Sequence, residues 1–297
     1  MSEAEVAIIR RQLMMQVRQD FVPISVEIYE PPKPRGTVFC LHDFHGVAAD
    51  FEILGKFLAE NGFRVVCPDM PGRGQSGIMP DPLRYTPSTY LAVLMAVIEK
   101  YATRRIVLLG KGWGGLLHLL LIKRMQFKLS GLILADVPLK WSVDTDQTIR
   151  EGLGILPKRF TTLDSGVAAL LALSEFVGID EADARRMAAG RLRPLDSGFI
   201  FHLDSALLGS VERASGRYYN AGEMLTAVTS RLLYLSASVL TEQQRESVSA
   251  ISKPAVAIGG LAPGGRLHFA HPSDLMLVLG FLVARRVTLR QASAQAI

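Results

Sequence analysis

Apolar and polar residues along this chain alternate between two patterns. Short runs rich in branched apolar residues predict buried strands; these lie at 37–42, 64–69, 105–110 and 129–138. Between them, apolar positions that recur every three to four residues predict helices; these segments are 50–62, 86–101 and 113–125. Strands that alternate with helices in this way form a mostly parallel sheet covered on both faces. Residues 21–36 predict an antiparallel strand ahead of this unit.

The pattern changes between residues 140 and 225. Helical periodicity at 163–179 and 180–192, with Asp180 as a candidate N-cap, precedes a brief extended piece at 199–204. The strand–helix alternation then resumes and ends in a helix from about His271 to Arg290. We therefore expect an α/β core made of residues 1–139 and 226–297. Residues 140–225 are expected to form a helical cap over the carboxyl edge of the sheet, where ligands bind in such folds.

Composition narrows the class of protein. The chain has 297 residues, 49% of them hydrophobic and 21% charged, which is ordinary for a folded domain. Its net charge is +5, but lysines and arginines are scattered, the densest group being Arg285, Arg286 and Arg290. Nucleic-acid binding is therefore not expected. No apolar run reaches the roughly 18 residues of a membrane helix, and the N-terminal residues do not form a signal peptide. A cytoplasmic location is expected, with Cys40 and Cys67 as reduced core residues.

The segment "LGKGWGG" at 109–115 joins an expected strand to an expected helix. A glycine-dense turn in this setting is typical of the nucleophile elbow, G-x-S-x-G, whose middle residue presents a reactive side chain. Here the middle residue is Gly112. An elbow residue adopts a strained left-handed conformation, which glycine accepts without a Cβ penalty. Glycine at position 112 is therefore expected in a protein that keeps the fold of this turn and has lost the reaction of its side chain.

The order of motifs resembles the α/β-hydrolase fold superfamily, with its bacterial esterase-like and meta-cleavage-product-hydrolase-like members nearest in character. "CLHDFHG" at 40–46 resembles the oxyanion loop, and "PDMPGRGQSG" at 68–77 resembles the turn after the fourth strand. "HFAHPSDLMLVLGFL" at 268–282 resembles the run that follows the catalytic histidine. The resemblance implies an α/β-hydrolase fold over almost the whole chain from about residue 18.

The resemblance also implies where a Ser-His-Asp triad would lie. The nucleophile position holds Gly112, the acid position holds Ser238 or Val239, and the histidine position holds Gly265. An engineered loss of the nucleophile would account for Gly112 alone. We therefore expect a non-catalytic pseudo-hydrolase with a degenerate triad, which acts as a small-molecule-binding or protein-interaction module.

The alternative is a hydrolase or lyase of changed mechanism that acts on a small ester, carbonyl or ring substrate. It would use His268 or Asp136 as base together with backbone oxyanion donors. A pocket filled by aromatic side chains would favour the binding module, and an open pocket with His268 facing Gly112 would favour the enzyme. A third possibility is a structural subunit without a ligand.

The pocket residues expected from the motifs surround the elbow; they are Phe44, His45, Lys111, Gly112, Trp113, Trp141 and His268. Lys111 either forms an anion-binding spot with the start of the following helix or points to solvent. Trp113 and Trp141 either fill the space of a substrate or stack on a ring-shaped ligand. His118 is expected to be a hydrogen-bonded core histidine.

No metal site and no cofactor are expected, because the histidine pairs lack a nearby carboxylate in a metal-binding pattern. The expected partner is a small molecule under the cap or another protein. A homodimer is the default oligomer because two-fold symmetric assemblies are the commonest.

Overall fold

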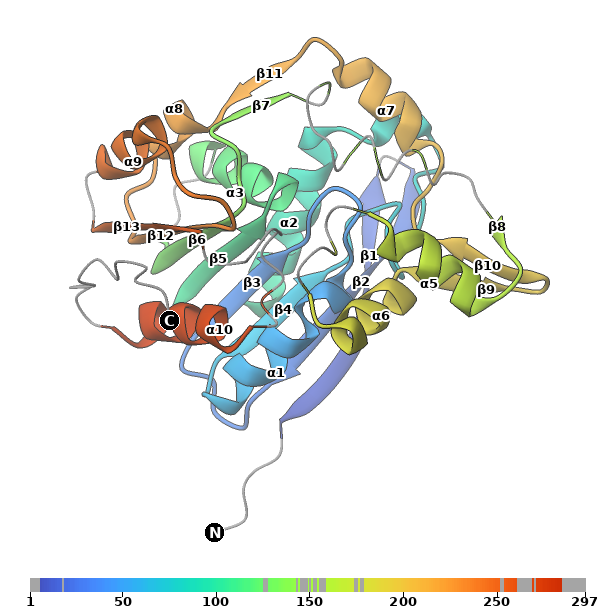
Figure 1. Cartoon of the computed structure of the whole chain (residues 1–297), viewed down its shortest axis with the longest axis horizontal. Coiled ribbons are helices and arrows are strands. Elements are labelled where there is room, and N and C mark those ends of the chain that lie inside the picture. The colour runs from blue at the N-terminus through green and yellow to red at the C-terminus, as the bar shows by residue number, and fades with distance from the viewer. Residues whose placement is uncertain are drawn as a thin grey trace.

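The computed structural model of the chain describes most residues between 6 and 284. The residues outside the description are 1–5, 18, 125–127, 143, 145–148, 150, 152–153, 155–158, 174–175, 177–178, 252–253, 261–268, 270 and 285–297. Within the described residues, eight strands form one sheet in the order β1-β2-β4-β3-β5-β6-β12-β13 (Figure 1). Their bounds are β1 (Ala7–Val17), β2 (Asp20–Glu30), β3 (Thr37–Leu41), β4 (Arg64–Pro68), β5 (Ile106–Lys111), β6 (Gly131–Ala135), β12 (Leu232–Ser236) and β13 (Ala255–Gly259).

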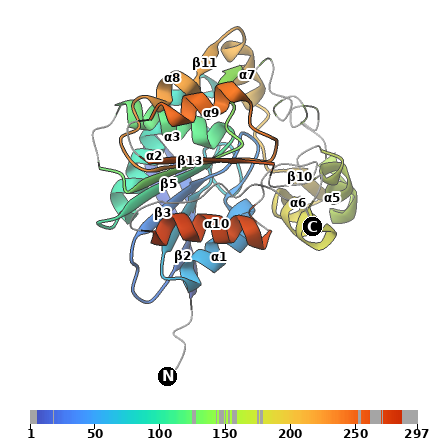
Figure 2. The same ribbon diagram turned by 60° about the vertical axis from the view of Figure 1, so that its left-hand side comes forward.

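From β4 to β13 along the sheet, each strand is parallel to the next, as the apolar runs predict, whereas β4 pairs antiparallel with β2 on its other side. Helices α1 (Glu52–Glu60) and α10 (Pro272–Val283) cover one face. The other face is covered by α2 (Pro87–Tyr101), α3 (Trp113–Arg124), α8 (Ala221–Leu225) and α9 (Glu242–Ser249). Figure 2 shows the sheet between these two layers. Because both faces are covered, side chains on alternate positions of each central strand are buried in opposite cores.

The first strand is the part of the sheet that the sequence did not predict. β1 pairs with β2 in antiparallel register from Ala7 opposite Glu30 to Val17 opposite Asp20. Most of its side chains are exposed or half-buried, so its apolar and polar residues do not alternate as in a strand with one covered face. β2 itself confirms the antiparallel strand expected at 21–36 and pairs with β4.

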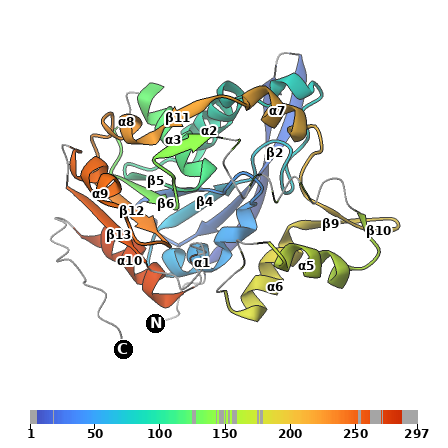
Figure 3. The same ribbon diagram turned by 45° about the horizontal axis from the view of Figure 1, so that its top comes forward.

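Residues 140–225 contain helices and also short strands (Figure 3). The helices before α8 are α5 (Leu163–Leu171), α6 (Glu181–Gly190) and α7 (Leu207–Ala214). Two small antiparallel sheets join them: β8 (Arg159–Phe160) with β10 (Gly198–Phe201) and β9 (Leu192–Leu195), and β7 (Lys140–Ser142) with β11 (Tyr218–Asn220). The brief extended piece expected at 199–204 overlaps β10, and the other short strands correct the expectation of a helical cap. Strands of two to four residues are too short to show a period.

This segment is joined to the core by buried charge. Arg191, which follows α6, donates from Nη2 to Asp50 Oδ2 at 2.8 Å and from Nε to Asp50 Oδ1 at 3.1 Å. Asp50 belongs to the short 3-10 helix η1 (Ala48–Phe51), next to the loop that follows β3. Arg191 is 1% exposed. Asp180 caps α6 as expected, accepting a hydrogen bond from the backbone N–H of Ala182 at 2.9 Å.

None of the helices in the described part of the chain combines the length and the apolar character that crossing a bilayer requires.

Candidate functional site

The turn between β5 and α3 has the backbone geometry of a nucleophile elbow. Gly112 has a φ of +48°, the left-handed conformation that the motif predicts. Its N–H donates to the Ala135 carbonyl at 2.8 Å, which ties the turn to the end of β6. The surrounding glycines allow β5 and α3 to pack backbone against backbone, since a Cβ on Gly110 would lie 2.4 Å from the Cα of Gly115. The backbone turn that would present a reactive side chain is therefore intact.

The carboxylate of Asp43 lies at this turn, in the space next to Gly112. Its Oδ1 accepts hydrogen bonds from the backbone N–H of Phe44 at 2.8 Å and of Trp113 at 2.9 Å. Phe44 lies in the loop after β3, and Trp113 is the residue after the elbow position. In the nucleophile-elbow arrangement these two backbone positions supply the oxyanion hole. In this chain one carboxylate oxygen therefore takes the bonds that a reaction intermediate would take.

Gly112 and Asp43 occupy complementary space. A Cβ built on Gly112 would lie 2.4 Å from both carboxylate oxygens of Asp43, closer than real Cβ contacts. A serine at position 112 could not coexist with the observed position of Asp43. The missing side chain at the elbow is thus what makes room for the carboxylate.

Aromatic side chains enclose a small apolar cavity beside this turn. Its volume is about 60 Å³. The Trp113 ring meets Tyr90 edge-on with the ring centroids 5.0 Å apart, and it meets Phe44 at 5.7 Å. Trp141 lines the same cavity from the 140–225 segment and contacts Tyr219 at 5.5 Å. Functional ligand pockets measure roughly 300–1,000 Å³. In this structure the aromatic rings fill most of the space next to the elbow.

Arg73 is buried behind the same rings. It is 1% exposed, and its guanidinium carbon lies 4.6 Å from the Trp113 ring centroid and 4.7 Å from that of Phe44. Its Nε donates to the Phe44 carbonyl, and its Nη1 donates to the Pro71 carbonyl at 3.0 Å. Its Nη2 has no hydrogen-bond partner among the described residues. The cation is therefore stabilised mainly by carbonyl dipoles and aromatic faces.

Lys111 does not point to solvent, which corrects one of the two expectations for it. It is the last residue of β5 and is 5% exposed. Lys111 lies one residue before Gly112, at the turn whose Trp113 N–H binds the Asp43 carboxylate. Its burial rules out the solvent-facing position, and the anion-binding spot stays a prediction.

The two histidines of the β3 loop are structural. His42 accepts a hydrogen bond at Nε2 from the Met70 N–H at 3.0 Å, and its Nδ1 lies 2.7 Å from the Asp43 carbonyl. Burial lowers the pKa of His42 to about 3, so its ring is neutral near pH 7. His45 is 2% exposed and faces the Phe201 ring at 6.4 Å and Arg191 Nη1 at 3.5 Å. His45 therefore contacts the 140–225 segment and is not among the residues that line the small cavity.

Asp69, in the segment "PDMPGRGQSG", holds the turn after β4 through backbone hydrogen bonds. It accepts hydrogen bonds from the backbone N–H of Ala48 at 2.7 Å and of Gln75 at 2.9 Å. Burial raises the pKa of its carboxyl to about 6.

The candidate acids and the position expected for the acid lie after the ends of β6 and β12. Asp136 has a φ of +49° and accepts a hydrogen bond from the Ala237 N–H at 2.8 Å, so its carboxylate joins the ends of β6 and β12. Val239 is 76% exposed and cannot supply a group to the turn. Ser238 lies 3.2 Å from Ser236, Oγ to Oγ. Gly265 and His268 lie outside the described residues.

His118 differs from its expectation. It is fully buried in α3, and neither of its ring nitrogens has a hydrogen-bond partner among the described residues. Desolvation lowers its pKa to about 3. Among the described residues it is a neutral core histidine held by packing.

Sequence reasoning does not identify Asp43 or Arg73, although Asp43 lies in the motif at 40–46 and Arg73 in the motif at 68–77. The signal for Asp43 was an acid in the oxyanion loop of a chain whose elbow residue has no side chain. A motif read in isolation cannot show that these two positions share the same volume. No sequence signal marks Arg73 as buried, because arginine is rarely buried without a carboxylate partner.

Residues 36–174 match the α/β hydrolase fold family. A 3-hydroxybutyrate-oligomer hydrolase from Cupriavidus necator is 28% identical over 199 residues, which are 65% of this chain and 67% of that protein. A proline iminopeptidase from Lactobacillus crispatus is 42% identical over 71 residues, which are 24% of each chain.

Solved structures match over nearly the whole length. An alpha/beta hydrolase from Novosphingobium aromaticivorans has a TM-score of 0.75 and 25% identity, covering 93% of this chain and 98% of that one. A putative hydrolase from Rickettsia typhi has a TM-score of 0.72 and 17% identity, covering 94% and 98%. The chain therefore has the α/β-hydrolase fold, and proteins that resemble it in sequence are named as hydrolases and peptidases.

Proposed function

We propose that this chain is a non-hydrolytic protein of the α/β-hydrolase fold, which uses the scaffold to bind a small molecule or another protein. The observation that carries the proposal is the pair of hydrogen bonds from the Phe44 and Trp113 N–H groups to Asp43. An ester hydrolase needs these donors for the oxyanion that develops in its transition state. Here the side chain of Asp43 already accepts both hydrogen bonds, so an incoming carbonyl oxygen would have to displace it.

Two further features support the same proposal. The elbow residue, Gly112, cannot form a covalent intermediate because it has no side chain. The cavity beside it, at about 60 Å³, is far smaller than an ester substrate needs. We propose that residues 140–225 act as a cap on the core and that a bound ligand would be small and apolar or aromatic. Such a ligand would enter between Trp141 and Trp113 after a shift of side chains.

The second candidate function is a hydrolase of changed mechanism. It is favoured by the same carboxylate, because Asp43 lies where a nucleophile or a base would act. In such a reaction Asp43 would accept a proton from water while the water oxygen attacks the ester carbonyl. The acyl–oxygen bond would then break, and the proton on Asp43 would pass to the leaving alkoxide, which departs as an alcohol. Asp136, the base considered from the sequence, already accepts a hydrogen bond from Ala237. The name of the Cupriavidus necator relative makes oligomers of 3-hydroxybutyrate, which are esters, the first substrate to test.

Ester turnover separates the two candidates. The purified chain would be incubated with p-nitrophenyl acetate, p-nitrophenyl butyrate and a 3-hydroxybutyrate oligomer, and product release would be compared with the protein-free rate. The binding proposal predicts no excess rate. Turnover that disappears in Asp43→Asn would overturn it in favour of the hydrolase. Asp164→Asn, which alters an exposed carboxylate in the first turn of α5, is the matched control.

A further inference from the structure

A second hollow, larger than the cavity beside Trp113, lies far from the elbow. Its volume is about 770 Å³, and it is formed where several strands begin: Arg35 precedes β3, Arg105 precedes β5, Ser130 precedes β6 and Arg231 precedes β12. Gly112 follows the other end of β5, so the length of a six-residue strand, roughly 20 Å, separates the two regions. Ligands of open α/β sheets bind beyond the carboxyl ends of the strands. A cavity at the amino ends therefore has no role assigned by the fold.

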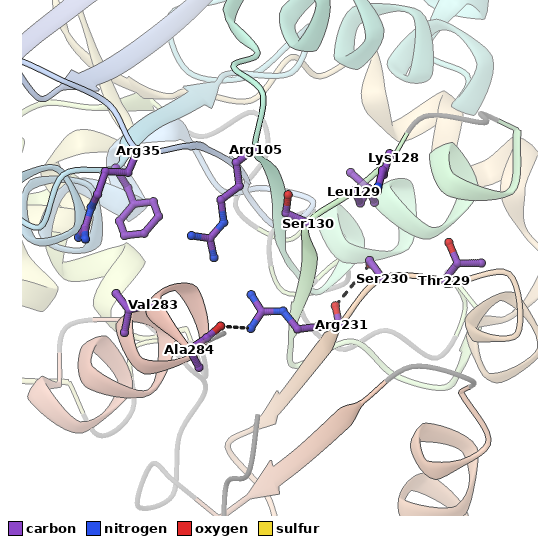
Figure 4. Close-up of a pocket in the computed structure, with 11 residues that line it drawn as sticks. Arg35, Arg105, Lys128, Leu129, Ser130, Thr229, Ser230, Arg231, Val283 and Ala284 are labelled. Carbon is purple, nitrogen blue, oxygen red and sulfur yellow. Dashed lines mark hydrogen bonds between the residues drawn. The ribbon is translucent and has the colours of Figure 1, made fainter. Parts of the chain in front are cut away.

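The lining of this hollow is strongly basic. Arg35, Arg105, Arg231 and Lys128 contribute four cations, and no Asp or Glu is among the lining residues. None of the four forms an ion pair with a carboxylate in the described part of the chain. Figure 4 shows the side chains of Arg105 and Arg231 directed toward each other across the hollow, with Ser130 beside them. The positive charges of Arg35 and Arg231 act unfavourably on Arg105, and an anion placed between the three guanidinium groups would remove that repulsion.

The guanidinium groups are held in place and keep most of their donors. Arg231 donates from Nη1 to the Ala284 carbonyl at 2.6 Å, and Arg105 donates from Nη2 to the Leu282 carbonyl. Both carbonyls lie at the end of α10. Arg231 also stacks on Phe281 with its guanidinium carbon 4.7 Å from the ring centroid. Each guanidinium has five N–H donors, so capping a helix end uses only a part of its capacity.

Burial and neighbouring positive charge both lower the pKa values of arginines in this hollow. Burial lowers the pKa of Arg105, and the neighbouring positive charges of Arg231 and Arg35 lower it further. Burial also lowers the pKa of Arg231. Arg35 and Arg105 both lie over the Phe63 ring, at 5.0 Å and 5.6 Å from its centroid. Fixed, partly desolvated arginines on an apolar floor are the surroundings in which charge-assisted hydrogen bonds are strongest.

We propose that this basic cavity, defined by Arg35, Arg105, Lys128 and Arg231, binds a small molecule that carries a di- or triphosphate group. Arginine forks match the oxygen geometry of phosphates, and several cations select a ligand with several negative charges. The hydroxyl groups of Ser130 and Thr229 line the same hollow and can donate to the remaining oxygens. The volume fits an organic ligand larger than an inorganic ion. The source is either free polyphosphate or a nucleotide, which share this chemistry.

Binding would be measured by titration calorimetry of the full chain at low and at physiological salt. The probes are inorganic tripolyphosphate, ATP, ribose 5-phosphate and citrate. The proposal predicts saturable one-to-one binding of tripolyphosphate or ATP and at least about tenfold weaker binding of the singly phosphorylated sugar, because a charge-assisted hydrogen bond is worth roughly one order of magnitude. ATP that binds more tightly than tripolyphosphate identifies a nucleotide, and the reverse order identifies polyphosphate. Citrate that binds as well as either phosphate probe would overturn the assignment to phosphate.

Variants test whether the named residues form the site. Arg105→Gln and Arg231→Gln are each expected to weaken binding about tenfold or more, and Arg231→Lys less, because lysine keeps the charge and loses the fork. Since both arginines also donate to α10, Lys128→Gln provides a second test at an exposed position that is not expected to affect folding. Arg217→Gln removes an equal charge from an exposed position in the 140–225 segment. Equal weakening in Arg217→Gln and in the cavity variants, or no saturable binding at all, would overturn the proposal.

Discussion

A Cβ built on Gly112 would lie 2.4 Å from the carboxylate oxygens of Asp43, so a side chain at position 112 and the observed Asp43 carboxylate would occupy the same space. The nearest backbone donors, Phe44 and Trp113, bind the carboxylate on one side, and the absent side chain admits it on the other. The replacement at the elbow and the acid in the loop are therefore parts of the same arrangement.

The first prediction follows from this shared volume. Gly112→Ser is expected to cost several kcal/mol of unfolding free energy, because the new Cβ would overlap Asp43 and serine is strained at a φ of +48°. In the Asp43→Gly background the same substitution should cost less by about 1–3 kcal/mol, the usual coupling of residues in contact. Urea unfolding of the four proteins measures this difference. Equal costs in both backgrounds would show that the two positions are independent.

The second prediction concerns His118. Both of its ring nitrogens lack a partner in the described part of the chain, and leaving a polar group buried in this way costs about 1–3 kcal/mol. His118→Leu is therefore expected to raise the unfolding free energy by a similar amount at pH 8. His271→Asn, at an exposed N-cap, controls for the loss of a histidine. A destabilised leucine variant would indicate that the ring is hydrogen-bonded in solution.

The advantage of the leucine variant should depend on pH. Because the pKa of His118 is lowered to about 3 in the folded state, the unfolded chain takes up its proton near pH 6.5 and the folded chain does not. His118 thus makes the wild type lose stability as pH falls from about 6.5 toward 3, at up to about 1.4 kcal/mol per pH unit. The difference between the two proteins should widen over that range and stay constant above it. A constant difference at pH 5 and pH 8 would contradict the lowered pKa.

The buried pair Arg191 and Asp50 gives the third prediction. The side chains of the two residues are 1% and 8% exposed, so Arg191→Met would leave an unpaired buried carboxylate. We expect a loss of about 3–5 kcal/mol, the usual cost of breaking such a pair from one side. Asp50→Asn combined with Arg191→Met should recover part of the loss. Arg185→Met, in an exposed pair with Glu181, should change stability by less than about 1 kcal/mol.

The fourth prediction concerns the two cysteines, which are both free and buried. Burial raises the pKa of the Cys67 thiol, with a hydrogen bond to Cys40 as a further cause. Because the thiolate is the reactive form, neither cysteine should react with a thiol reagent in the folded protein, and both should react in denaturant. Rapid labelling of the native chain would contradict the buried position.

The sequence predicts the core of this fold well, because a covered parallel sheet requires strands that are apolar on both faces. It also predicts the left-handed conformation of Gly112, because several glycines within 109–115 indicate a turn between strand and helix that side chains would obstruct. It does not predict β1, whose exposed side chains carry no period, or the short strands within 140–225 other than β10. At the site, the motifs locate the turn and its absent nucleophile. The Asp43 carboxylate is found only when two loops, 70 residues apart, are placed together in space.

The bond from Trp113 to Asp43 also has a mechanical consequence. Trp113 is the first residue of α3, so Asp43 serves as an N-terminal cap that is supplied from a distant segment rather than by a neighbour in sequence. A negative charge at this end of the helix is favourable for the helix dipole as well. The loop after β3 and the start of α3 are consequently fastened to one another. In a nucleophile elbow this turn presents a reactive side chain. In this chain it links the loop after β3, which belongs to the sheet, to the helix layer that contains α3.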